Sequence, residues 1–164
     1  MDDIKTIFKK IFQAQDPNIV EIIDILKKIP IFSELTWMEL KKLETIIHER
    51  VYAKDEVVFQ EYEPGAGMYI IKSGEIGLTK TEDGQEIKLA ELQQGEFFGE
   101  LSLLNDTPRT ATARALRRTE LLGFFRPDLL NLLQRDPKLG SRVLLKLAQV
   151  ISQRLQHATE RIKG

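Results

Sequence analysis

Apolar residues recur at helical spacing in the first third of the chain. Residues 2–14 carry an apolar stripe with lysines away from it, and an Asp-Pro-Asn sequence interrupts this first predicted helix. A second helix is predicted from Ile19 and ends before Pro30. Thr36 and Glu39 have the spacing of a capping box, so we expect a third helix to begin there.

From about residue 50 the pattern changes to short runs of β-branched and aromatic residues separated by turn residues. Asp83-Gly84 is the strongest hairpin signal in the chain. Many short strands with frequent turns predict an antiparallel β-roll, or jelly roll, over about residues 50–125. The expected strands are 57–60, 68–72, 75–81, 87–92, 111–115 and 120–125.

Helical spacing returns over residues 127–134 and from Lys138 to about Ile162. Helices on both sides of a β-roll predict an α+β fold. The final helix has apolar residues that step by three and four, close to the heptad spacing of a coiled-coil seam. These residues are Leu144, Leu147, Ile151, Leu155, Ala158 and Ile162. Such a face packs either on the protein's own β-roll or on a second copy, and the sequence leaves both alternatives open.

The composition argues against several kinds of chemistry. A chain of 164 residues with 42% hydrophobic content fits one domain with a single core. The net charge of −1 gives no support to nucleic-acid binding, which usually leaves a basic footprint. No cysteine is present and the two histidines are far apart, so we expect no thiol chemistry, no metal site and no cofactor. Without a triad or paired catalytic acids, we expect no enzyme and no catalytic residue.

The location of the protein is predicted from what the sequence lacks. No apolar run is long enough to cross a membrane, and the N-terminus is acidic where a signal peptide would be basic. We therefore expect a cytoplasmic protein. The apolar stripe over residues 2–14 has the form of a membrane-surface helix, but Asp2 and Asp3 oppose such contact. Packing on the protein itself or on a partner is the preferred interpretation.

Residues 97–113 form the most informative stretch of the chain. Gly99 lets the backbone approach a ligand closely, and a short helix after it, beginning at Glu100, offers N–H groups to an anion. Arg109 offers a planar fork of donors to phosphate oxygens. An ionised Glu100 only accepts hydrogen bonds, so it fits a hydroxyl group. The stretch therefore suits a small ligand that carries both a phosphate and hydroxyl groups.

Residues 98–104 and 108–111 together resemble the phosphate-binding cassette of the cyclic nucleotide-binding domain family. This family includes the regulatory domains of cyclic-nucleotide-dependent kinases, gated ion channels and bacterial catabolite-activator-type regulators. The resemblance covers roughly residues 29–155 and implies a β-roll between helices. It divides the chain into an N-terminal helical extension over residues 1–28 and a binding domain over residues 29–164.

The resemblance implies a role for each cassette residue. Glu100 would bond the ribose 2′-hydroxyl, Arg109 would pair with the exocyclic phosphate oxygens, and the backbone amides of Gly99 and Ser102 would complete the cradle. The implied ligand-binding residues are Phe98, Gly99, Glu100, Leu101, Ser102, Arg109, Thr110 and Ala111.

Thr110 bears on which base is bound. In the family, a threonine after the arginine often accompanies tolerance of cyclic GMP, although members with threonine still take cyclic AMP. The hydroxyl therefore leaves the base open. We expect cyclic AMP to be favoured over cyclic GMP, because bacterial-looking single-domain members most often resemble cyclic AMP receptors.

The resemblance also implies a switch. In the family the final helix closes over the base as a lid or pairs with its symmetry mate, so residues 126–162 would hold the hinge and the lid or dimer helices. A homodimer and an unidentified protein effector are the implied partners. Two other interpretations stay open, namely a scaffold protein that has kept only the fold, and a fragment of a DNA-binding regulator. The latter needs a helix-turn-helix after the final helix, and with the chain ending at Gly164 we expect none.

Overall fold

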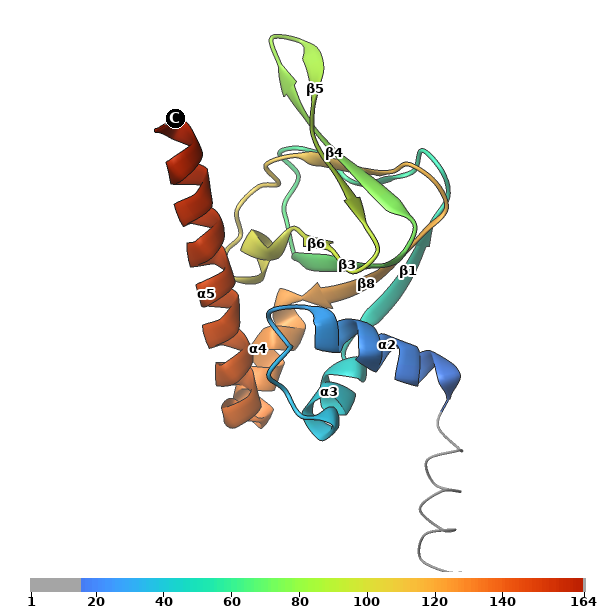
Figure 1. Ribbon diagram of the computed structural model, residues 1–164, viewed down its shortest axis with the longest axis vertical. Coiled ribbons are helices and arrows are strands. Elements are labelled where there is room, and N and C mark those ends of the chain that lie inside the picture. The colour runs from blue at the N-terminus through green and yellow to red at the C-terminus, as the bar shows by residue number, and fades with distance from the viewer. Residues whose placement is uncertain (1–15, 164) are drawn as a thin grey trace, which may run out of the picture.

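The computed structural model describes residues 16–163, so the helix predicted over residues 2–14 lies outside the described residues. Helices precede and follow a β-roll in chain order (Figure 1). The α-helices of the described part are α2 (Pro17–Lys28), α3 (Trp37–Glu44), α4 (Arg126–Arg135) and α5 (Pro137–Ile162).

The strands form two four-stranded antiparallel sheets, with orders β1-β8-β3-β6 and β2-β7-β4-β5. The predicted α+β fold with a jelly roll is confirmed. The elements are β1 (His48–Tyr52), β2 (Val57–Phe59), β3 (Gly67–Ser73), β4 (Glu75–Glu82), β5 (Gln85–Gln93), β6 (Phe97–Phe98), the 3-10 helix η1 (Glu100–Leu103), β7 (Thr112–Ala115) and β8 (Thr119–Phe125).

Two strands of the structure, β1 and β6, were not predicted from the sequence. Strand β1 joins the edge of its sheet, and its side chains are mostly exposed, so they lack the alternation that identifies a strand. Strand β6 has only two residues, Phe97 and Phe98, and pairs with Tyr69 and Ile70 of β3. It carries the chain directly into η1, so the start of the cassette is fixed by the sheet.

The sheet containing β3 serves two cores because successive side chains of a strand point to opposite faces. Met68 and Ile70 belong to a helix-facing cluster that also contains buried residues of α2, α3, α4 and α5. Ile71 belongs to a smaller cluster inside the roll. Of the neighbouring residues in β6, Phe97 belongs to the helix-facing cluster and Phe98 to the cluster inside the roll. The start of the cassette is therefore anchored in both cores.

The helix boundaries follow the capping signals of the sequence. Thr36 and Glu39 form the predicted capping box, in which the Glu39 N–H donates to Thr36 Oγ1 at 3.3 Å and the Thr36 N–H donates to Glu39 Oε2 at 2.8 Å. Asp16 caps α2 by accepting from the Asn18 N–H at 2.9 Å. Asp136 caps α5 by accepting from the Leu139 N–H at 3.2 Å. Each cap satisfies backbone groups that the first helical turn leaves unpaired.

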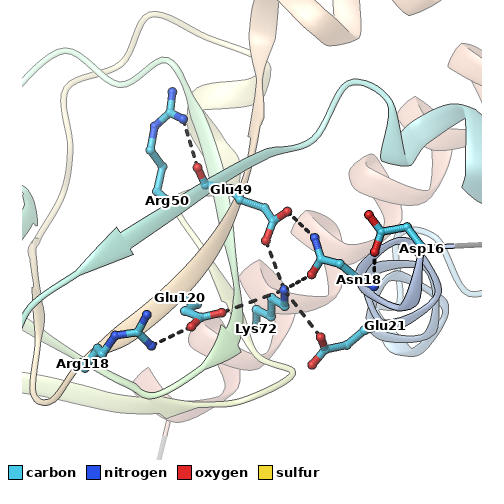
Figure 2. Close-up of polar contacts among 8 residues, drawn as sticks. All are labelled: Asp16, Asn18, Glu21, Glu49, Arg50, Lys72, Arg118 and Glu120. Carbon is cyan, nitrogen blue, oxygen red and sulfur yellow. Dashed lines mark hydrogen bonds and ion pairs between the residues drawn. The ribbon is translucent and has the colours of Figure 1, made fainter.

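A polar cluster around Lys72 ties α2 to the sheet (Figure 2). Lys72 lies on β3 and is only 6% exposed. Its Nζ donates to Asn18 Oδ1 of α2 at 2.5 Å and to Glu49 Oε2 of β1 at 3.1 Å. Glu21 of α2 and Glu120 of β8 place carboxylate oxygens 3.6 and 3.9 Å from the same atom. One buried cation therefore joins a helix to three strands.

The long helix α5 changes its surroundings along its length (Figure 1). Leu139, Val143 and Leu147 in its first half are buried in the helix-facing cluster. Leu155 and Ile162 in its second half are 68% and 85% exposed. In the part of the chain that the structure describes, no helix is long and apolar enough to span a membrane.

Candidate functional site

A cavity of about 310 Å³ opens where the cassette meets the β-roll and α5. All eight residues that the sequence predicts as ligand-binding line this one cavity. Seven further residues complete its lining, namely Phe59, Leu78, Leu92, Phe97, Thr107, Pro108 and Arg154. The cassette thus contributes most of the polar groups, α5 adds Arg154, and the strands contribute an apolar wall.

Gly99 gives the cassette its turn. It adopts a left-handed backbone with φ of 77°, and a Cβ there would lie 2.5 Å from Arg109 Nη1. Any other residue would be strained and would also displace the arginine. The helix that follows is a four-residue 3-10 helix in which the Ser102 N–H already donates to the Gly99 carbonyl at 3.3 Å. That long hydrogen bond leaves the Ser102 amide only weakly engaged.

Arg109 is buried in the cavity wall, with 6% of its surface exposed. Its Nη1 donates to the Gly99 carbonyl at 3.2 Å, and its Cζ lies 3.9 Å from the centroid of the Phe59 ring. Its Nε is buried and has no hydrogen-bond partner among the described residues. Buried polar groups are nearly always hydrogen-bonded, so an orphaned guanidinium nitrogen beside a cavity indicates a missing acceptor.

The guanidinium also keeps its charge in this position. Burial lowers the pKa of Arg109, while the nearby Tyr69, Glu63 and Glu100 act in the opposite direction. An arginine pKa starts so far above neutrality that the group stays protonated at physiological pH. The cavity therefore contains a fixed positive charge in a poorly solvated place, where an anion is attracted more strongly than it would be at the surface.

Glu100 is likewise buried, with 8% of its surface exposed, and its carboxylate is hydrogen-bonded to another side chain. Its Oε1 accepts from Arg154 Nη1 at 2.6 Å, and the Arg154 guanidinium lies 4.2 Å from the centroid of Phe97. Arg154 belongs to α5, 54 residues further along the chain. Sequence reasoning missed it because only the fold brings α5 to the cassette.

A backbone pairing holds the end of the cassette in place. The Tyr62 N–H donates to the Arg109 carbonyl, and the Arg109 N–H donates to the Glu63 carbonyl, both at 2.8 Å. Gly65, in the loop between β2 and β3, packs closely against two side chains of the cassette, because a Cβ there would lie 1.9 Å from Ser102 Oγ and 3.1 Å from Arg109 Nε. The loop between β2 and β3 therefore sets where the arginine side chain lies.

The rest of the lining separates into apolar and hydroxyl-bearing residues. Leu78, Leu92 and Leu101 supply apolar surface, whereas Thr107 and Thr110 supply hydroxyl groups at the exposed side. Among the described residues, no group of histidine or acidic side chains is arranged to hold a metal ion. The site therefore offers the buried guanidinium of Arg109, the ion pair of Glu100 with Arg154, and an apolar wall. This set suits an anionic ligand that also carries a flat or apolar group.

Comparison with known proteins agrees with this geometry. Residues 49–136 match the family model for the cyclic nucleotide-binding domain. The cyclic AMP receptor protein of Thermus thermophilus is 36% identical over 134 residues, which cover 81% of this chain and 60% of that protein. The cAMP-dependent protein kinase regulatory subunit of Mycosarcoma maydis is 36% identical over 95 residues, which cover 58% of this chain and 18% of that protein.

Solved structures give the same result. A cyclic nucleotide-binding domain from Methylobacillus flagellatus KT has a TM-score of 0.77 and 28% identity, with 88% of this chain and 82% of that chain covered. The present chain spans 60% or less of the length of the two curated relatives. The match over residues 49–136 extends through the β-roll, the cassette and α4, and the chain belongs to the cyclic nucleotide-binding domain family.

Proposed function

We propose that the cavity binds a cyclic nucleotide, with cyclic AMP favoured over cyclic GMP, and that the chain acts as a sensor module without catalytic activity. The observation that carries this proposal is the buried, charged Arg109 with its unpartnered Nε. A phosphodiester brings one negative charge and acceptor oxygens, which would satisfy both the charge and the orphaned donor. The names of the relatives, a cyclic AMP receptor and a cAMP-dependent kinase subunit, support cyclic AMP as the first ligand to test.

Each part of the cavity has a place in this proposal. Arg109 would pair with the exocyclic phosphate oxygens, next to the backbone of Gly99 and Ser102. Glu100 would accept a hydrogen bond from the ribose 2′-hydroxyl, because an ionised carboxylate cannot donate to phosphate and repels it. The base would lie along the apolar wall. Thr110 is exposed at the rim, where its hydroxyl is available to a base or a phosphate.

Arg154 gives the proposal a switching step. Its guanidinium donates to the carboxylate of Glu100. A ribose hydroxyl would compete for the same oxygens, so binding would change the contact between α5 and the cassette. Ligand would then favour the arrangement of α5 that binds it more tightly, by the difference in affinity between the two arrangements. Helix α4, which links β8 to α5, would serve as the hinge.

We also propose a homodimer through the second half of α5. Ile151, Leu155, Ala158 and Ile162 step by four, three and four, and the last three of them are exposed. Leu147, which the sequence placed in the same seam, is fully buried in the helix-facing cluster. The first half of α5 thus packs on its own domain, and the exposed face that remains has the spacing of a short coiled coil.

The proposed function is tested by displacement of a fluorescent cyclic AMP analogue. Unlabelled cyclic AMP should displace it at lower concentration than cyclic GMP, and 5′-AMP, which carries a second phosphate charge, should displace it poorly. A protein that has kept only the fold would not bind the analogue at all, and that result would reject the proposal.

The role of Glu100 is tested separately with 2′-deoxy cyclic AMP. If Glu100 bonds the 2′-hydroxyl, the deoxy analogue should bind about 10- to 150-fold more weakly, the range for one hydrogen bond to a charged group. The variant Glu100→Gln should lose most of this discrimination. Equal affinity of the two ligands for the unmodified protein would show that Glu100 has another role.

A further inference from the structure

We propose that Phe59 is a positioning residue that holds Arg109 in the orientation needed for phosphate, an inference that rests on the proposed function. Phe59 is the last residue of β2, in the sheet opposite β3 and β6. No ligand-related role could be predicted for it from the sequence. Its ring face lies 3.9 Å from Arg109 Cζ, which is well within the distance of a cation–π interaction.

The ring is one of three surfaces that enclose the guanidinium. A Cβ on Gly99 would lie 2.5 Å from Arg109 Nη1, and a Cβ on Gly65 would lie 3.1 Å from Arg109 Nε. Those two sides are therefore bare backbone in close contact with the guanidinium edge. The Phe59 ring covers the face of the group. No ion pair with a carboxylate is formed by Arg109 within the described part of the chain.

The Phe59 ring is itself fixed by other aromatic residues. Its centroid lies 5.8 Å from that of Phe98 and 6.2 Å from that of Tyr69. Tyr69 and Phe98 stack on each other with centroids 5.7 Å apart and an interplanar angle of 26°. Both distances from Phe59 fall in the range of favourable aromatic pairs. These contacts fix the orientation of the Phe59 ring, and the guanidinium that packs on its face is held in one orientation by it.

The chemistry of this support suits a phosphate-binding arginine. A carboxylate partner would fix the arginine equally well, but it would neutralise the charge and occupy the donors that a phosphate needs. The π face of a phenyl ring stabilises a buried cation without accepting its N–H groups. The Nε–H has no acceptor among the described residues, and the ring holds the guanidinium in place, so less orientational freedom is lost when an anion binds.

The experiment compares cyclic AMP binding by Phe59→Leu, which keeps apolar bulk and removes the π face, with binding by Phe59→Tyr, which keeps it. Phe59→Leu should weaken binding about 5- to 30-fold, and Phe59→Tyr should stay within about threefold of the unmodified protein. Phe32→Leu is the matched control, because it removes a buried ring from the helix-facing cluster and does not touch the cavity. The affinity of Phe32→Leu for cyclic AMP should stay within about twofold of that of the unmodified protein.

The same substitution is then made in an Arg109→Ala background. If Phe59 acts through Arg109, Phe59→Leu should change the residual affinity by less than about twofold there. A loss of equal size in both backgrounds would show that the ring contacts the ligand directly and would overturn the inference. Unchanged affinity of Phe59→Leu in the unmodified background would overturn it as well, without affecting the proposed function.

A measurement without nucleotide separates this inference from the proposed function. In the ligand-free protein, the NMR signal of the Arg109 Nε–H should carry a ring-current shift that Phe59→Leu abolishes and Phe59→Tyr retains. If cyclic AMP fails to bind the unmodified protein, the proposed function is wrong, and the NMR comparison still decides whether Phe59 fixes the arginine. An Arg109 signal that is identical in Phe59→Leu would reject the positioning role.

Discussion

Arg109 and Glu100 lie in the same cavity with opposite charges, yet each has a different neighbour. Glu100 is paired with Arg154 of α5, whereas Arg109 rests on Phe59 and keeps one nitrogen unpartnered. This asymmetry leaves one donor of Arg109 without a partner among the described residues, whereas the Glu100 carboxylate is already hydrogen-bonded.

The residues of the cavity differ in how far their roles could be predicted from the sequence. The cassette is contiguous, so Gly99, Glu100 and Arg109 could be assigned to one site from their order alone. Phe59 and Arg154 come from distant elements and reach the cavity only through the fold. A phenylalanine in a strand and an arginine on a helix carry no local signal of such a role, and they could not be predicted.

Tyr62 provides a prediction about backbone strain beside the site. It has a left-handed backbone with φ of 70°, although it is a bulky residue and is 72% exposed. Glycine adopts this conformation without strain, but it also makes the unfolded chain more flexible. Tyr62→Gly should therefore raise the free energy of unfolding by about 0.5–1 kcal/mol in urea titrations. A decrease of similar size would mean that the exposed ring contributes packing that outweighs the strain.

Tyr52 and Lys72 together predict how stability depends on alkaline pH. Burial, with a smaller effect of Tyr69, raises the pKa of Tyr52 to about 12 from its ordinary 10.0. Burial works to lower the pKa of Lys72, but its hydrogen bond and charge interactions with Glu49, and the charges of Glu21 and Glu120, outweigh burial and raise it above 10.5. Both groups hold their protons longer when folded, so stability should fall as the pH rises above 10.

The measurement is the free energy of unfolding at several pH values from 9 to 12. Tyr52→Phe removes one of the two groups, so its stability should fall less steeply than that of the unmodified protein over this range. Parallel curves for the two proteins would contradict a raised pKa of Tyr52 in the folded state.

At the scale of elements, the helices were predicted better than the sheet edges. Helix α3 has the predicted capping box, and the hairpin at Asp83-Gly84 joins β4 to β5 as expected. Strands β1 and β6 were missed because one is mostly exposed and the other has two residues. The polar cluster around Lys72 was also beyond prediction, because its members come from α2, β1, β3 and β8.

The Lys72 cluster predicts how firmly α2 is fixed to the roll. Lys72→Met keeps the length of the side chain and leaves three carboxylates without their common cation. It should lower the free energy of unfolding by about 1–2 kcal/mol, less than for a fully buried pair because Glu21 and Glu49 are about half exposed. Lys80→Met is the control, since Lys80 forms a surface pair with Glu82, and it should change stability by less than about 0.5 kcal/mol. Equal effects of the two substitutions would show that the cluster adds no stability.

At the scale of the whole molecule, α5 connects the cavity to the outside. Its first half is part of the helix-facing core, Arg154 contacts the cassette, and its last turns extend with apolar residues exposed. Because one continuous helix carries all three contacts, the proposed change at Glu100 would reach a partner bound at its end through α5.

The proposed dimer gives the prediction at this scale. Leu155→Glu places a charge in the exposed apolar face and should shift the protein to a monomer in sedimentation velocity experiments. Leu145→Glu is the matched control, because Leu145 is also exposed, at 61%, but lies outside the heptad positions. It should leave the sedimentation coefficient unchanged. A monomer in the unmodified protein, with and without cyclic AMP, would rule out the dimer.

The proposed cyclic nucleotide site is tested most directly by isothermal titration of the protein with cyclic AMP. We predict one binding site per chain and a loss of about 2–5 kcal/mol of binding free energy in Arg109→Ala, the range for removing one member of a buried charged pair. Arg114→Ala, which removes a partly buried arginine of strand β7 that does not line the cavity, should bind as the unmodified protein does. Unchanged affinity in Arg109→Ala, or no heat of binding in the unmodified protein, would contradict the assignment of this cavity as a cyclic nucleotide site.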